Sequence, residues 1–166
     1  DNTATGHGAL LANTTGIQNS AFGRASMDAN TTGANNSSLG YTALQKTTTG
    51  SGNTGLGHGA LRQNTTASNN TAVGKAALAT NTTGTQNVAV GSLAGDALTT
   101  GSNNVAFGHA ALGADTEGSS SVAIGAFALD SQNTSGNTYN VAIGRDAGGV
   151  VTTGVQNVLI GGLAGD

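Results

Sequence analysis

The chain has 166 residues, of which 8% are charged and 3% aromatic, and its formal net charge is −3. Average proteins carry about 25% charged residues and disordered chains usually carry a high net charge, so the composition fits neither an ordinary globular domain nor a disordered segment. The chain has no Cys or Pro, which excludes disulfides and thiolate metal sites, and its few basic residues argue against a nucleic-acid partner.

A glycine recurs at every seventeenth position along almost the whole chain. Regular spacing of this kind indicates one supersecondary unit stacked on itself. We therefore interpret residues 1–166 as a single repetitive domain, and we expect it to be a fragment of a longer fibre protein. The period is interrupted once, by a step that is two positions longer and ends at the ninth of the ten glycines: Gly6, Gly23, Gly40, Gly57, Gly74, Gly91, Gly108, Gly125, Gly144 and Gly161.

Each unit begins with a short segment such as Asn104-Val105-Ala106-Phe107. It is too short for a helix, and its β-branched and aromatic residues predict a strand. The Asn lies four residues before the glycine, and only Ser121 departs from this column. We predict that the Asn side chains form an amide ladder that bonds copies above and below or caps turn backbone: Asn19, Asn36, Asn53, Asn70, Asn87, Asn104, Asn140 and Asn157.

The first residue of the predicted strand changes character along the chain. It is Thr or Ser in the five units up to Thr71 and Val in the five units from Val88 onward. Alternation along a strand places it on the same face as the residue just before the glycine. We therefore expect more apolar surface in the C-terminal half, which either thickens the core or meets another chain.

The residue just after the glycine varies more freely in charge and size than any other. This variation predicts a solvent-facing column, which is our candidate for surface binding. The three His residues of the column lie three units apart, about 14 Å at about 4.8 Å per coil, which is too far for one metal ion. We predict no metal site and no cofactor. The candidate surface-binding residues are His7, Arg24, Tyr41, His58, Lys75, His109 and Arg145.

The next part of the unit is Ala followed in most units by Leu or Met, which predicts a second short extended piece. A helix is the alternative, but only about four residues are available for it. The Asn-Thr-Thr-Gly segment that follows predicts a turn in which Gly supplies a positive φ. The two additional residues around residues 131–139 predict a bulged turn that leaves the ladder intact. We interpret the acidic residues, including Asp115 and Glu117, as solvated turn positions, and we predict no enzymatic activity.

These elements together predict an all-β fold, a β-solenoid or parallel β-roll of about ten 17-residue coils. Such a rod is roughly 48 Å long. With so few large side chains it has little core to stabilise it alone, which favours association with further copies.

Two motifs resemble known fibres. The segments Ser121–Gly125 and Asn140–Gly144 resemble the core motif of YadA-like heads in trimeric autotransporter adhesins, and residues 70–84 resemble repeats in bacteriophage tail fibres. The resemblance implies a homotrimeric left-handed β-roll on a cell surface or virion, outside the cell.

We therefore expect a structural and adhesive fibre segment that presents a rod for attachment to a host or another surface, with a surface glycan or protein as partner. One alternative is an ice-binding solenoid that uses the paired Thr columns, although adjacent threonines of a strand point to opposite sides. Another is a monomeric solenoid that polymerises end to end into an extracellular filament. The apolar runs are too short to span a bilayer, so we expect no membrane insertion.

Overall fold

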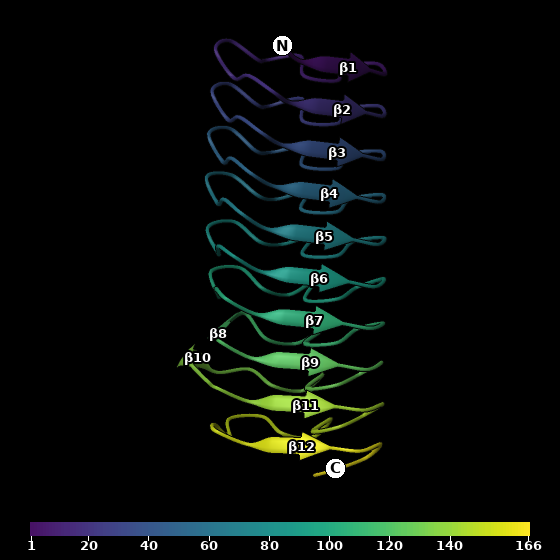
Figure 1. Cartoon of the computed structure of the whole chain (residues 1–166), viewed down its shortest axis with the longest axis vertical. Helices are drawn as coiled ribbons and strands as arrows, with labels where there is room; N and C mark the ends of the chain where they lie inside the picture. The colour runs from purple at the N-terminus through teal and green to yellow at the C-terminus, as the bar shows by residue number, and fades with distance from the viewer.

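The computed structural model describes all 166 residues and shows a straight rod of stacked coils (Figure 1). It contains strands and turns but no helix. Ten coils each contribute one three-residue strand to a single parallel sheet. These strands are β1 (Thr3–Thr5), β2 (Ser20–Phe22), β3 (Ser37–Leu39), β4 (Thr54–Leu56), β5 (Thr71–Val73), β6 (Val88–Val90), β7 (Val105–Phe107), β9 (Val122–Ile124), β11 (Val141–Ile143) and β12 (Val158–Ile160).

Successive strands of the sheet pair through equivalent positions of the repeat. Val88 pairs with Val105, and Val105 pairs with Val122, so each residue pairs with its equivalent in the next repeat. Each strand position of the repeat therefore forms a straight row along the rod. The predicted β-solenoid, with one coil for each repeat of the sequence, is confirmed.

The core is a narrow strip inside the coils. The middle residue of each strand points inward, and Ala89 and Ala106 are at most 1% exposed. The opposite wall is the Ala and Leu of the return segment, and Ala77 and Leu78 are fully buried. The two outer residues of each strand point away from this strip, so the Val row that begins at Val88 belongs to the outer face and does not thicken the core.

The return segment is not the second extended piece that we expected. Ala110 and Leu112 have left-handed backbones, with φ of 51° and 56°. Left-handed backbone costs a non-glycine residue roughly 1–2 kcal/mol. It lets the segment bond alternately to both neighbours, because Ala110 N–H donates to the Ser92 carbonyl and Leu112 N–H to the Ala128 carbonyl. These bonds and the burial of Leu112 offset the strain.

The glycine of the Asn-Thr-Thr-Gly turn does not have the positive φ that we expected; it lies in close contact with the next coil, although Ala67 occupies the same position in one unit. A Cβ on Gly84 would lie 2.2 Å from the carbonyl oxygen of Gly101 in the next coil. The left-handed residue of this turn lies two positions later, at Gln86, with φ of 59°. The glycine therefore suits a position where adjacent coils approach closely.

The enlarged unit between Gly125 and Gly144 forms the predicted bulged turn. Within this unit β10 (Ser135–Asn137) pairs with β8 (Glu117–Ser119) beside the main stack (Figure 1). Val122 of β9 still pairs with Val141 of β11. The rod therefore passes the insertion without ending or losing register.

One coil rearranges its core without a change of shape. Gly95 occupies the place where most coils have Leu, and Leu98 occupies the place where most coils have a polar residue. A Cβ on Gly95 would lie 3.1 Å from the side chains of both Leu78 and Leu98. Leu98 is fully buried, so it fills the space that a Leu at position 95 would occupy.

Candidate functional site

The outer face of the sheet is the main apolar surface of the rod. We define the outer face as the first and third residues of the ten sheet strands. In the C-terminal half both rows are apolar, and large side chains are exposed: Phe107 53%, Ile124 37%, Ile143 37%, Val158 69% and Ile160 67%. An exposed apolar strip of this kind is typical of an interaction surface.

The N-terminal half of the outer face is mixed. Its third-residue row is apolar after the first coil, with Phe22 40% and Leu39 53% exposed, but its first-residue row is Ser or Thr. The small Ser20 and Ser37 leave a shallow hollow of about 280 Å³ beside Phe22, Leu39 and Leu56. Only the C-terminal half therefore offers a continuous apolar ridge.

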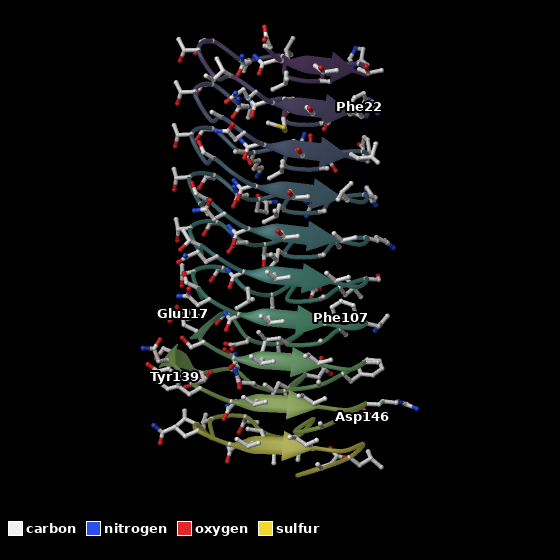
Figure 2. All side chains as sticks on the ribbon, in the orientation of Figure 1. Phe22, Phe107, Glu117, Tyr139 and Asp146 are labelled. Carbon is white, nitrogen blue, oxygen red and sulfur yellow. The ribbon has the colours of Figure 1, made fainter.

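The candidate surface-binding residues lie along one edge of the sheet and are exposed. Three of them, in consecutive coils, stack on one another. The Arg24 guanidinium lies 5.7 Å from the centre of the Tyr41 ring, and the Tyr41 ring stacks on His58 with centres 5.3 Å apart. His109 instead contacts Phe127, with ring centres 5.1 Å apart. Figure 2 shows Phe22, Phe107 and Asp146 on this side of the rod and Glu117 and Tyr139 on the opposite side.

Charge is divided unequally along the rod. Residues 1–83 contain four Lys or Arg and two Asp or Glu, whereas residues 84–166 contain one and six. With neutral His, the halves carry +2 and −5. The ion pair between Arg145 and Asp146, 3.1 Å apart, is the only one, so the cations of the N-terminal half have no acidic partner.

Three of the six acidic residues of the C-terminal half, Asp130, Asp146 and Asp166, line a hollow of about 270 Å³ together with Phe127 and Arg145. Burial raises the pKa of Asp130 above its usual 3.8, and the neighbouring Asp146 raises it further. Asp130 and Asp146 occupy different columns, yet the fold brings them together. No three His, Cys, Asp or Glu side chains are placed to hold a metal ion.

The Asn column forms the predicted ladder. The Asn36 side-chain oxygen accepts the backbone N–H of Asn53 at 2.9 Å, and its amide donates to the Gly50 carbonyl at 2.9 Å. The pattern runs from Asn2 to Ser121, whose side chain cannot continue it, and resumes between Asn140 and Asn157 beyond the enlarged unit. A second inward Asn row, which includes Asn64 and Asn81 linked at 3.0 Å, was not identified from the sequence. Its regular spacing in the turn segment was the available signal.

The interpretation of Asp115 as a solvated turn residue is wrong. Asp115 is fully buried because it belongs to the second Asn row. Its carboxylate accepts the Gly118 N–H at 2.9 Å and the Gln132 amide at 2.6 Å. Gln132 also accepts a bond from Asn140 at 2.6 Å. This network fixes the inner side of the enlarged turn and has no opening to a ligand. Glu117 is exposed.

The two Thr columns have different environments. In the first, Thr48 Oγ1 donates to the Thr65 carbonyl of the next coil at 3.2 Å, and Thr82 donates to Thr99 at 3.0 Å. In the second, Thr49 and Thr83 are exposed. Only the second column can present hydroxyls to solvent, as alternation predicts.

No helix of the protein is long and apolar enough to cross a membrane. Comparison with protein-family models, with curated proteins and with solved structures gives no match.

Proposed function

We propose that the chain is a segment of a non-enzymatic structural and adhesive fibre whose copies pack in parallel through the outer face of the sheet. The observation that carries this proposal is the continuous apolar ridge from Val88 to Ile160, exposed on a rod that has no other surface of this kind. Burying it against an identical ridge removes apolar area from water.

The residue rows of the outer face favour one relative direction of the packed chains. In a parallel, in-register assembly the apolar rows from Val88 onward meet apolar rows at the same level of the neighbouring copy. In an antiparallel assembly the Val row from Val88 onward would face the Ser and Thr row that ends at Thr71. The parallel arrangement therefore buries more apolar area and leaves fewer hydroxyls without partners.

The width of the face favours three chains over two. A strip about 48 Å long and about 10 Å wide offers each chain about 480 Å², compared with about 800 Å² per partner in a standard interface. Three chains around one axis let each face contact two neighbours. The resemblance of residues 121–125 and 140–144 to YadA-like heads supports the same trimer.

The adhesive role follows from the shape. A straight rod holds its exposed edge away from the surface that anchors it, and copies along the rod and around the axis let weak contacts add through avidity. This role places the protein outside the cell, on a cell surface or virion.

The molar mass in solution tests the self-association. We expect multi-angle light scattering to give three times the 15.9 kDa of one chain. A mass of one chain at all concentrations would overturn the proposal. A broad series that grows with concentration would instead indicate end-to-end filaments.

An ice-binding solenoid is the second candidate, because Thr32, Thr49, Thr66 and Thr83 form an exposed row with a spacing of about 4.8 Å. Its neighbouring Thr row has its hydroxyls bonded to backbone, which leaves a single row of free hydroxyls. Thermal hysteresis that disappears when Thr49 and Thr66 are replaced by Lys would establish this candidate in place of the fibre.

A further inference from the structure

We propose that the N-terminal half of the edge binds a linear acidic polysaccharide through Arg24, Tyr41, His58 and Lys75, a set we name the edge strip. The inference rests on the proposed adhesive function and names the class of its ligand. The recognised groups are carboxylates or sulfates spaced along the sugar chain.

Three of the four edge-strip residues, Arg24, Tyr41 and His58, are held in place by stacking before any ligand arrives. Arg24 lies over Tyr41 at 5.7 Å, and Tyr41 stacks on His58 at 5.3 Å with 26° between the ring planes. Each contact links side chains of adjacent coils and restricts their rotamers. Binding therefore has less side-chain entropy to remove than it would on free surface cations.

Stacking places the planes of the Arg24, Tyr41 and His58 side chains against one another. Their polar atoms, which lie at the edges of these planes, remain available to solvent. Tyr41 is 47% exposed, and the other three side chains are exposed as well. The result is a row of guanidinium, hydroxyl, imidazole and ammonium donors, one per coil, about 14 Å long. Carboxylate and sulfate oxygens form charge-assisted bonds with such donors.

The row is open on both sides. On one side lie the repeat glycines, and on the other lies a column of small residues, Ala25, Thr42, Gly59 and Ala76. In the C-terminal half the same column carries Leu93, Ala110, Phe127, Asp146 and Leu163, of which only Ala110 is small. An extended chain can therefore lie along the edge in the N-terminal half only.

The distribution of charge also favours the N-terminal half as the binding region. Arg24 and Lys75 lie in the half with a net charge of +2 and have no acidic partner, and a polyanion that extended toward the C-terminal half would meet a net charge of −5. Two formal cations are few for a nucleic acid, whose binding requires many phosphate contacts, whereas a sugar chain also offers hydroxyls as partners for Tyr41 and His58. Neither hollow of the rod is lined by the edge strip, so the pocket that usually anchors a protein partner is missing there.

The test measures binding of the intact chain to immobilised heparin and hyaluronan, with neutral dextran and single-stranded DNA as comparison probes, at about 50 mM salt. We expect heparin or hyaluronan to bind and dextran not to. The double variant Arg24→Ser/Lys75→Ser should bind at least about tenfold more weakly, which corresponds to about 1.4 kcal/mol. Tyr41→Ala should also weaken binding severalfold, although the charge is unchanged.

The matched control is Lys46→Ser/Arg62→Ser, which removes the same charge from the same half but leaves the edge strip intact. Its binding should fall less than threefold. An equal loss in both double variants would overturn the site, because net charge alone would then explain binding. Tighter binding to DNA than to either acidic polysaccharide, or no binding to either, would overturn the ligand class.

Light scattering on the same samples separates this inference from the proposed assembly. A trimer that does not bind acidic polysaccharide contradicts only the edge strip. A monomer that binds through the edge strip contradicts only the assembly.

Discussion

The two halves of the rod have the same backbone but opposite outer surfaces. Strands β5 and β6 pair in register, and Ala72 and Ala89 inside them are equally buried. Outside, Thr71 is followed by Val88, and the net charge changes from +2 to −5 between the halves. The inward columns therefore fix the coil, and the outward columns can differ between halves without altering it.

This difference assigns a separate proposed role to each half. In the proposed assembly the C-terminal half supplies the apolar ridge between copies, and the N-terminal half supplies the exposed cations and rings for the proposed ligand. The comparison is testable, because equivalent substitutions can be made in either half of the same repeat.

The largest expected effect comes from charge on the outer face. Val122→Lys/Val141→Lys should weaken self-association at least about 100-fold, because burying an unpaired charge costs about 3–5 kcal/mol. Ser37→Lys/Thr54→Lys should weaken it much less, because that half presents a mixed surface. Light scattering over a concentration series measures both. Equal effects would mean that the halves contribute equally to the interface.

The next effect concerns the rearranged core of the sixth coil. Leu98→Asn should destabilise the chain by about 2–5 kcal/mol, because it leaves a cavity beside Gly95. Gly95→Leu/Leu98→Asn restores the usual pattern and supplies an amide beside Asn81, whose buried side-chain oxygen has no partner. It should lie within about 1.5 kcal/mol of the wild type. Urea unfolding followed by circular dichroism gives both values, and a double variant no better than Leu98→Asn would refute the compensation.

The smallest effect is the pH dependence of the acidic hollow. Burial and then Asp146 raise the pKa of Asp130, and burial raises the pKa of Asp96. The folded chain then binds protons more tightly than the unfolded chain, so this contribution to stability is present below about pH 3.8 and is lost as pH rises through the folded pKa. His109 beside both carboxylates opposes the shift.

Asp130→Asn should therefore raise the melting temperature slightly at pH 7 and leave it unchanged at pH 3. The gain is below about 1 kcal/mol, because exposed charges are screened by solvent. Thermal unfolding at the two pH values measures it. A variant that is less stable than wild type at pH 7 would show that the Asp130 carboxylate stabilises the fold.

The repeat made most of the fold predictable. The constant glycine gave the register of the coils. Alternation along the strand predicted that Val105 points outward and Ala106 inward. The insertion could be placed because Asn140 resumes the repeat. The return segment was not predictable, because positive φ at residues such as Leu112 contradicts local preference and is stabilised by bonds to neighbouring coils. Gly84 was misinterpreted for a related reason, since its constraint is the carbonyl oxygen of Gly101 in the next coil.

The candidate site was predictable only in part. Free variation after the glycine located the exposed edge, but the stack of Arg24, Tyr41 and His58 depends on side chains one coil apart in space. Asp115 shows the opposite case. It looked like a turn residue when considered alone, whereas its column of mostly buried residues predicts its burial.

The most direct test of the proposed assembly is disulfide cross-linking of single-cysteine variants, because the chain has no cysteine of its own. Val122→Cys places one thiol on the outer face, and Thr83→Cys places one on the exposed Thr row as a control. Parallel, in-register packing brings identical Val122 positions close enough for a disulfide. Such packing predicts covalent dimers of Val122→Cys and none of Thr83→Cys after mild oxidation; efficient cross-linking of Thr83→Cys with none at Val122→Cys would contradict it.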